Sequence, residues 1–276
     1  MNRVYNIEMR VVSASILAFS AVLCGIASEN PTVLQLPVRS RVEVFRGSGE
    51  WAPVNVTRSF PVSSTAILIC DMWDKHWCEG ASHRVDALAQ KMAPVIDLAR
   101  SHHVQIIHAP SEVMDFYKTV PQRIGITQIA KAEPPPSLAL TDPPLPIDDS
   151  RGGCDTGGAF YKAWTRENPA LRITGDDVVS DNGAEVYSFL RRKGIHNLLV
   201  MGVHTNMCIL KRSFAIRQMT NWGIHCVLVR DLTDTMYDPK ERPFVSHDQG
   251  TELVVEHIEK YWGPSMLSAD LVKALQ

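Results

Sequence analysis

The sequence predicts an α/β fold: a doubly wound, Rossmann-like parallel sheet with helices on both of its faces. Short apolar segments alternate with amphipathic segments of helical length along most of the chain. The apolar segments carry few polar residues, which is typical of parallel strands that are buried on both faces. The length of 276 residues is sufficient for one large domain with a substantial apolar core.

The predicted elements follow one another in strand–helix order. The expected strands are 65–70 (TAILIC), 104–108, 178–179, 198–201 and 225–229. The expected helices are 85–100, 184–193, 206–217 and 251–261, and Gly194 is expected to end the second of them. The prolines of segment 133–149 remove backbone donors and fix φ, so we expect an irregular surface loop there.

The first 27 residues are predicted to be a secretory signal peptide. Arg3 and Arg10 precede an apolar run, 11–26, and Gly25 and Ala27 supply small residues near its end. The run is short for a membrane span. We therefore expect cleavage near Ala27 and a secreted or periplasmic protein that has no contact with the membrane afterwards. An uncleaved signal that anchors the protein in the membrane is the alternative.

The remainder divides into two parts. Residues 28–64 show no sustained hydrophobic period and are interpreted as an N-terminal extension packed on the domain. Residues 65–276 contain all the predicted strands and helices and form the α/β domain.

The charge balance argues against a polyanionic partner. Lysine and arginine together number 28 and aspartate and glutamate 30, which gives a net charge of −2 without long runs of one sign. Nucleic-acid binding needs a basic face, so no nucleic acid is expected as a partner. A small molecule is the expected substrate.

A cysteine and an aspartate stand where open parallel sheets place their active sites. Asp71 directly follows the strand 65–70, and Cys208 opens the helix predicted after the strand 198–201. The positive end of a helix dipole lowers the pKa of a thiol. An acid beside such a thiol can take its proton and later deliver it to a leaving group. For Asp71 the alternative is a residue that only caps its loop.

The other cysteines leave Cys208 unmatched. Cys70 and Cys226 lie within apolar strands and are interpreted as inert core residues. Cys78 and Cys154 both lie in loop-like segments, and we expect them to form a disulfide in an oxidising compartment. Cys208 is then the odd cysteine of an exported chain and a candidate reactive thiol.

Three segments resemble the isochorismatase-like cysteine hydrolases, a family that includes nicotinamidase and N-carbamoylsarcosine amidase. They are TAILICDMWD, LLVMGVHTNMCIL and VRDLTD (229–234), and the resemblance covers roughly residues 65–261. It implies a parallel sheet of about six strands and an Asp–Lys–Cys triad with Cys208 as the nucleophile and Asp71 as the proton carrier. It also implies oxyanion donors at the N–H groups of Cys208 and His204, a cis peptide near Val203-His204, and a homo-oligomer.

The chain departs from the family pattern at the lysine. The segment 177–181, which follows the third predicted strand, contains no lysine. Lys75, four residues after Asp71, and Lys162, in the glycine-rich loop, are the candidates to replace it. Without a cation, thiolate formation would depend on the helix dipole or on a nearby histidine such as His204. Arg212 and Arg217 are interpreted as part of a solvated helix face.

A metal centre is a second hypothesis. The chemistry implied by the resemblance requires no cofactor, but Asp74 and His76 form an Asp-x-His motif, and His108 ends the second predicted strand. These side chains offer the mixed nitrogen and oxygen ligands of a zinc-like divalent ion. The alternative is that Trp73, His76 and Trp77 form the wall of the substrate pocket.

The function expected from these observations is that of an exported small-molecule hydrolase of amidase type, with Cys208 attacking a carbonyl carbon. Two alternatives remain open. The missing lysine favours a catalytically inactive protein that binds a ligand, and the Asp-x-His motif favours a metal-dependent hydrolase.

Overall fold

The computed structural model describes residues 32–276, so the predicted signal peptide, 1–27, lies outside the described residues. The strands are β1 (Val33–Glu43), β2 (Trp51–Pro61), β3 (Thr65–Cys70), β4 (Gln105–Ala109), β5 (Val178–Val179), β6 (Asn197–Val203), β7 (His225–Asp234) and β8 (Ser265–Met266). The helices are α1 (Glu79–Ser101), α2 (Met114–Tyr117), α3 (Pro121–Thr127), α4 (Gly183–Lys193), α5 (Cys208–Lys211), α6 (Ile216–Asn221), α7 (His247–Tyr261) and α8 (Ser268–Leu275), and a 3-10 turn spans Val62–Ser64.

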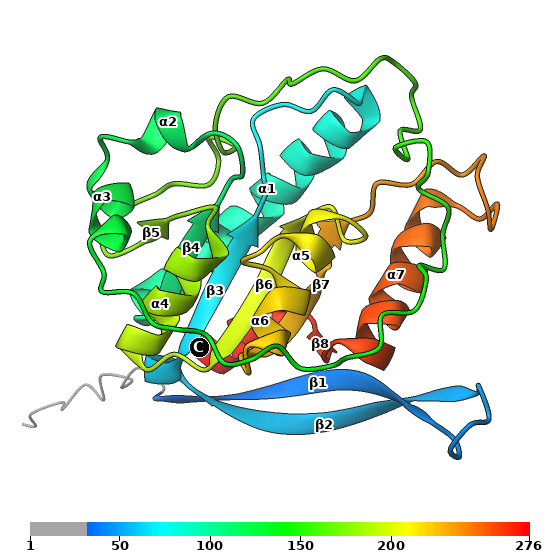
Figure 1. Ribbon diagram of the computed structural model, residues 1–276, viewed down its shortest axis with the longest axis horizontal. Helices are drawn as coiled ribbons and strands as arrows, with labels where there is room; N and C mark the ends of the chain where they lie inside the picture. The colour runs from blue at the N-terminus through cyan, green and yellow to red at the C-terminus, as the bar shows by residue number, and fades with distance from the viewer. Residues whose placement is uncertain (1–31) are drawn as a thin grey trace, which may run out of the picture.

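A single sheet passes through the molecule in the order β2-β1-β8-β7-β6-β3-β4-β5 (Figure 1). The six strands from β8 to β5 are parallel, and β1 and β2 are antiparallel. Numbered from β3, the parallel strands run 3-2-1-4-5-6, which is the Rossmann order. The predicted doubly wound fold is therefore confirmed, but the described sheet has eight strands where about six were expected.

The two additional strands come from the predicted N-terminal extension. Residues 33–61 form a hairpin whose first strand pairs with β8. The alternation of Leu34, Leu36 and Val38, which are all buried while their neighbours are exposed, is the period of a half-buried strand. Our sequence analysis missed this signal. The described part of the extension thus continues the sheet of the domain.

Helices cover both faces of the sheet. In β3, Ala66 and Leu68 face a core formed with α4, α6 and α7, whereas Ile67 and Ile69 face a second core formed with α1 and α8. Successive side chains of a strand point to opposite faces, so an apolar strand is required wherever both faces are covered. No described helix has the length and hydropathy needed to cross a bilayer.

Most of the predicted helices and loops are present. The helix expected at 184–193 is α4, with Asn182 accepting hydrogen bonds from the backbone at its start and Gly194 in a left-handed conformation at its end. Helix α7 begins four residues before the predicted start, because Ser246 and Gln249 form a capping box. No regular element occurs in the proline-rich segment 133–149, as expected.

The helix predicted at 206–217 is wrong. It is divided into α5, which has four residues, and α6, because Arg212 adopts an extended conformation with φ −64° and ψ 149°. This break directs the chain between the two helices back toward the end of β3. The break allows the side chain of Arg212 to contact Asp71.

Candidate active site

Asp71 and Cys208 lie at the switch point of the sheet. They follow β3 and β6, the adjacent parallel strands at which the strand order reverses, and Cys70 pairs with Gly202 there. A Cβ on Gly202, whose φ is 117°, would lie 2.1 Å from the carbonyl oxygen of Cys70. Only glycine permits this close approach of the two strands. Ligands of open α/β sheets bind at this switch point, beyond the carboxyl ends of the strands.

A buried turn connects β6 to Cys208. The Val203-His204 peptide is cis, as the resemblance implied. The N–H of Thr205 donates to the carbonyl of Asp234 at 2.9 Å, and the Asn206 side chain both accepts from and donates to the backbone of Met236. The turn is therefore fixed to the segment at the end of β7.

Asp71 is fully buried and adopts a left-handed conformation with φ 48°. Its Oδ1 accepts a hydrogen bond from the N–H of Ser111 at 2.6 Å, and its Oδ2 accepts one from Nε of Arg212 at 3.0 Å. Burial raises the pKa of Asp71 above its usual value, against the opposing effects of Arg212, Cys208 and Ser111. The carboxylate is held in place from both sides and can bind a proton more readily than an exposed aspartate.

Cys208 is partly buried beside this carboxylate. Burial and the negative charge of Asp71 raise the pKa of the thiol well above its usual value, while Arg212 and the backbone N–H of His204 act to lower it. The net lowering expected from a helix dipole is not found, and α5 is a single turn with few aligned peptide groups. The carboxylate of Asp71 lies beside the thiol and is the group placed to accept its proton.

Arg212 supplies the cation that the sequence appeared to lack. The guanidinium binds Asp71 through Nε and Glu112 through Nη2, and the surrounding negative charges raise the pKa of Arg212 although burial opposes them. Its interpretation as a solvated helix residue is wrong. The chain is extended at Arg212, and its side chain reaches Asp71 from there.

Neither lysine candidate reaches the aspartate. Lys75 is exposed and has no ion pair with a described residue, so its proposed catalytic position beside Asp71 is not formed. Nζ of Lys162 donates to the backbone carbonyl of Glu112 at 2.6 Å. The residue of the candidate site that our sequence analysis missed is therefore Arg212, whose signal was its proximity to Cys208 in sequence.

The two backbone N–H groups that the resemblance implies as oxyanion donors, those of His204 and Cys208, both lie at the thiol. The N–H of His204 acts on the sulfur of Cys208, and the N–H of Cys208 is the first in α5. Backbone groups at the start of a helix point outward without partners in the helix itself. The imidazole of His204 is buried and its Nε2 has no partner among the described residues. Burial lowers its pKa to about 3, so this ring is neutral at physiological pH.

Aromatic rings surround the cysteine. Trp73 and Trp164 stack with ring centroids 4.5 Å apart, and the Trp73 indole donates to the carbonyl of Ser111. Trp77 lies edge-on to Phe160, with centroids 5.9 Å apart, at the partly exposed side of this group. The three tryptophans belong to, or pack against, the apolar cluster that Cys208 also contacts. Trp73 and Trp77 thus belong to an aromatic group beside Cys208, and their role as walls of a substrate pocket stays a prediction.

The three metal-ligand candidates are not brought together. Asp74 accepts hydrogen bonds from the backbone and hydroxyl of Thr165. Nδ1 of His76 accepts from the N–H of Cys78 at 3.1 Å, and burial lowers the pKa of His76 to about 4. His108 lies between the carboxylates of Glu167 and Asp177, at 2.7 and 3.3 Å. Each candidate is thus engaged by different neighbours.

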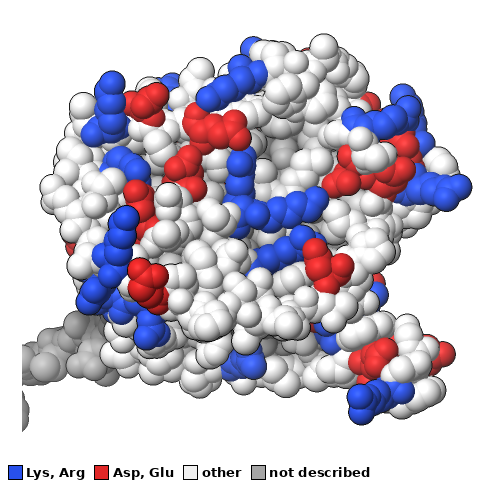
Figure 2. All heavy atoms as spheres, in the orientation of Figure 1, with Lys and Arg blue, Asp and Glu red and all other residues white. Residues whose placement is uncertain are grey.

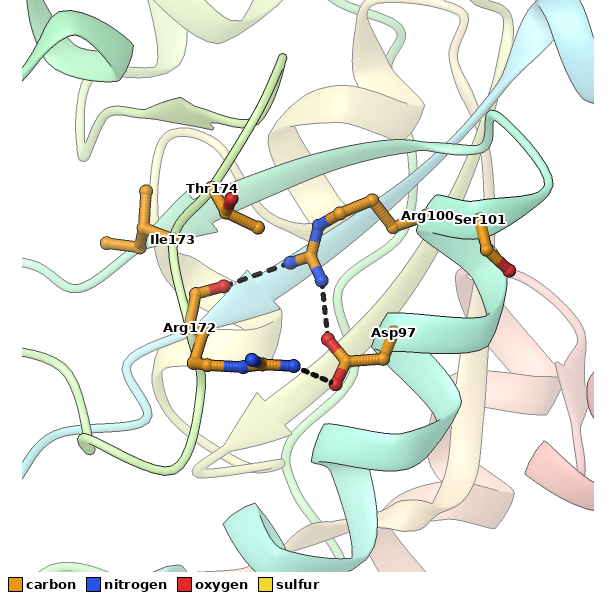
Figure 3. A pocket seen from close by; sticks show the side chains of 6 residues that line it. All are labelled: Asp97, Arg100, Ser101, Arg172, Ile173 and Thr174. Atoms are coloured by element: carbon orange, nitrogen blue, oxygen red, sulfur yellow. Dashed lines mark hydrogen bonds and ion pairs between the residues drawn. The ribbon is translucent and has the colours of Figure 1, made fainter.

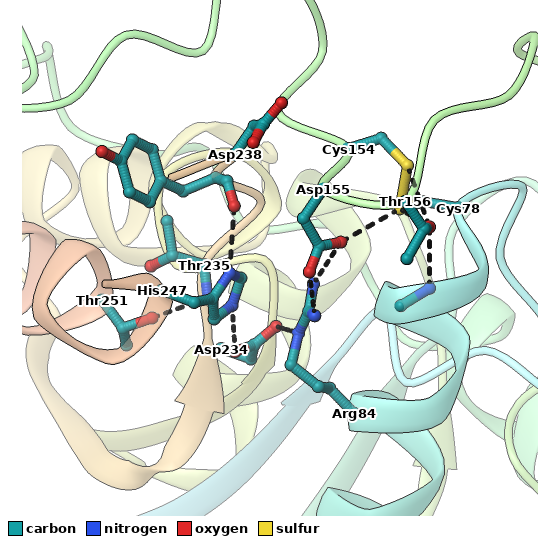
Figure 4. Close-up of polar contacts among 12 residues, drawn as sticks. Cys78, Arg84, Cys154, Asp155, Thr156, Asp234, Thr235, Asp238, His247 and Thr251 are labelled. Carbon is teal, nitrogen blue, oxygen red and sulfur yellow. Dashed lines mark hydrogen bonds and ion pairs between the residues drawn. A yellow bond between two sulfur atoms is a disulfide. The ribbon is translucent and has the colours of Figure 1, made fainter. Parts of the chain in front are cut away.

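Within residues 32–276, the one group of potential ligands close enough to share an ion is Cys78, Cys154 and Asp155. Its two sulfurs are already bonded to each other, which confirms the predicted disulfide (Figure 4). A zinc-like site formed by Asp74, His76 and His108 is therefore not supported. The physical reason is that the predicted ligands satisfy structural hydrogen bonds of the loops that carry them.

A separate cavity of about 660 Å³ lies away from Cys208, near the amino end of β4 (Figure 3). Asp97 accepts from Arg100 and from Arg172 there, each at 2.6 Å, so one carboxylate is shared by two guanidinium groups. Acidic and basic side chains are also interspersed on the face seen in Figure 2. Neither feature competes with the switch point as a candidate active site.

No family model matches this sequence, and no curated protein matches it either. Among solved structures, a cysteine hydrolase from Pseudomonas syringae pv. phaseolicola 1448A is 17% identical with a TM-score of 0.50, over 78% of this chain and 94% of that one. An isochorismatase family protein from Burkholderia thailandensis is 19% identical with a TM-score of 0.45, over 77% and 96%.

At these identities the likeness concerns the fold. The P. syringae structure is matched over almost its whole length, and the matched share of this chain is close in size to the predicted domain 65–276. The six parallel strands and the cis peptide before the cysteine agree with what the sequence resemblance implied. This chain has the isochorismatase-like hydrolase fold.

Proposed function

We propose that this protein is a small-molecule hydrolase that cleaves the C–N bond of an amide, with Cys208 as the nucleophile. The observation that supports this most strongly is the contact of Asp71 with Arg212 beside Cys208 at the switch point. It provides an acid–base group, a nucleophile and a counterion in one place. The cation also removes the main argument for a catalytically inactive protein, which was the missing lysine.

The charges determine the order of the steps. Asp71 takes the thiol proton of Cys208 as the sulfur attacks the carbonyl carbon and forms a C–S bond. The proton transfer leaves one negative charge on the pair, and this charge passes to the carbonyl oxygen as the C–S bond forms, while Arg212 remains beside Asp71. The carbonyl electrons move onto the oxygen, which the N–H groups of His204 and Cys208 would stabilise.

The remaining steps complete the hydrolysis. The tetrahedral intermediate collapses, the C–N bond breaks, and Asp71 delivers its proton to the leaving amine. A water molecule then attacks the thioester while Asp71 accepts a proton from it. The C–S bond breaks, Asp71 returns this proton to the sulfur, and the carboxylic acid leaves the regenerated thiol. The aromatic rings around Cys208 exclude other water and favour a planar or apolar acyl group.

The test is ammonia release from a panel of neutral primary amides, compared between the native chain and Cys208→Ala. Intact mass spectrometry of quenched reactions would locate the acyl adduct. We expect turnover and an adduct on Cys208 in the native chain, and neither in the variant. Turnover by a folded Cys208→Ala protein would refute the nucleophile. Absence of both turnover and adduct across the panel would favour the ligand-binding alternative.

We also propose that the protein is exported. The support is the basic and apolar pattern of residues 1–27 together with the Cys78–Cys154 disulfide, because disulfides persist in oxidising compartments. N-terminal sequencing of the protein from the exported fraction should give a start near residue 28. An intact Met1 in the membrane fraction would instead indicate the anchored form.

A further inference from the structure

We propose that the Cys78–Cys154 disulfide holds a chain of charged contacts that positions the His204 turn, and with it the oxyanion donors. Asp155, Arg84 and Asp234 are the positioning residues in this chain of contacts. The inference rests on the proposed function only in treating this turn as the oxyanion site. The contacts themselves are independent of any activity.

The disulfide joins two loops that are distant in sequence. Cys78 directly precedes α1, and Cys154 lies in the glycine-rich loop 76 residues later. The hydroxyl of Thr156 accepts a hydrogen bond from the N–H of Gly80 at 3.1 Å. Figure 4 shows the loop lying against the start of α1 at the disulfide. The loop is thus held to the helix by a covalent bond and by a polar contact.

This attachment places Asp155 over Arg84 of α1. Both carboxylate oxygens of Asp155 accept from the guanidinium, at 2.6 and 3.3 Å, and Nε of Arg84 donates to Oδ2 of Asp234 at 3.0 Å. The two carboxylates therefore share one guanidinium, whose planar donors fix the direction of each contact. The side chains of all three residues are at most 26% exposed, so solvent screens them only partly.

Asp234 is also held from its other side. Nε2 of His247 is 2.9 Å from Oδ1 of Asp234, and Nδ1 is 3.0 Å from the carbonyl oxygen of Tyr237. Both acceptors lack protons, so both ring nitrogens donate and the ring is an imidazolium. Burial lowers the pKa of His247, but its contacts with Asp234 outweigh this effect and raise it. The end of β7 is thus fixed between α1 and α7.

Asp234 transmits this position to the active site through its backbone. Its carbonyl accepts the N–H of Thr205 at 2.9 Å, and its Cα pairs with Val203 in the sheet. His204 lies between those two residues, and its N–H acts on the sulfur of Cys208. A displacement of Asp234 would therefore move an oxyanion donor without changing any residue that contacts substrate.

The experiment compares four full-length proteins: native, Cys78→Ser/Cys154→Ser, Asp155→Asn, and the combined variant. The first measurement is hydrogen exchange of a peptide containing Thr205, and the second is the pH profile of iodoacetamide labelling at Cys208. We expect exchange at Thr205 to be about tenfold faster in each variant than in the native protein, the effect of losing one charge-assisted hydrogen bond. We also expect a higher apparent pKa of labelling, because the N–H of His204 lowers the pKa of the thiol.

The combined variant distinguishes positioning from general loosening. If the disulfide acts through Asp155, adding Asp155→Asn to the double cysteine variant should change the exchange rate at Thr205 only slightly. If the two act independently, their effects on the free energy of opening should add. Asp148→Asn is the matched control, because this aspartate belongs to the same long loop but accepts from the N–H of Ser150. Arg84→Gln should also speed exchange at Thr205, and Arg84→Lys, which keeps the charge, should speed it less.

The proposal would be overturned if exchange at Thr205 were unchanged in the variants, or if the effects of the cysteine and Asp155 substitutions on exchange were additive. Should the double cysteine variant fail to fold, Asp155→Asn in the disulfide-bonded protein gives the same readout. Hydrogen exchange requires no substrate. If Cys208 proves unreactive, the proposed function is refuted, but the hydrogen-exchange test of this proposal can still be carried out.

Discussion

Nε of Arg212 donates to Oδ2 of Asp71 at 3.0 Å, across 141 positions of sequence. The opposite oxygen of the carboxylate accepts the N–H of Ser111 at 2.6 Å, so the aspartate has a fixed orientation toward Cys208. The cation reaches the aspartate from the segment after Cys208, because the chain leaves the helix at that residue. The predictions below depend on this contact.

Replacing Arg212 should make the thiol less reactive. The guanidinium lowers the pKa of both Cys208 and Asp71, so Arg212→Leu should raise both. At fixed pH near 7.5 we expect iodoacetamide labelling of Cys208 to slow by about tenfold for each unit of pKa increase. Arg212→Lys keeps the charge but loses the planar donors, so its labelling rate should lie between those of the native protein and Arg212→Leu.

Arg217→Leu provides the matched control for that comparison. This arginine lies in α6, forms an ion pair with Asp142, and is stacked over Trp262. Its removal should leave the labelling rate of Cys208 unchanged at equal stability. Equal slowing in the Arg212 and Arg217 variants would show that only the general charge of this segment matters.

Asp71→Asn should separate thiol reactivity from turnover. The carboxylate raises the pKa of Cys208, so the amide should lower it and make labelling faster at pH 7 to 8. The amide cannot carry a proton, so hydrolysis should fall by roughly 10²–10⁴-fold. The measurements are the labelling profile against pH and ammonia release. A parallel decrease of labelling and turnover would mean that Asp71 already holds the thiol proton in the resting enzyme.

The buried His108 should make the protein less stable in alkali. Burial lowers its pKa, but Glu167 and Asp177 outweigh this effect and raise it to about 9. A folded pKa above the unfolded value of about 6.5 stabilises the fold fully below pH 6.5, and this contribution is lost as pH rises through about 9. The free energy of unfolding in urea should therefore fall by up to about 3 kcal/mol between pH 6.5 and 9.5.

His108→Gln should remove this part of the pH dependence and lower stability at pH 7, because two buried carboxylates lose their shared cation. His83→Gln, at an exposed position of α1, is the control and should keep the native slope. If the free energy of unfolding of the His108 variant depends on pH as in the native protein, the loss of stability in alkali comes from other groups.

Local patterns were sufficient for much of the fold. The strand 65–70 was predicted with its observed bounds because a strand covered on both faces has to be apolar throughout. Gly194 marked the end of α4 because it adopts a left-handed conformation there. The hairpin was missed although Leu34, Leu36 and Val38 alternate correctly, since this signal covers only half of a strand whose remainder is polar.

The error at residues 206–217 shows where local patterns fail. The segment has the composition of a helix, but the chain is extended at Arg212, which reaches the carboxylate that follows β3. The same limit affected the metal hypothesis. Asp74 and His108 have suitable chemistry for ligands, but their partners lie in segment 165–177, far along the chain.

The sequence by itself determined the alternation of strands and helices, the positions of Asp71 and Cys208 at strand ends, and the cysteines available to pair. Burial periodicity and turn chemistry encode these features over a few neighbouring residues. The tertiary structure decided that Arg212 supplies the cation, that the pKa of the thiol is raised, and that Asp155 and Asp234 share Arg84. Electrostatic interactions depend on distances through space, and only the folded chain fixes those distances.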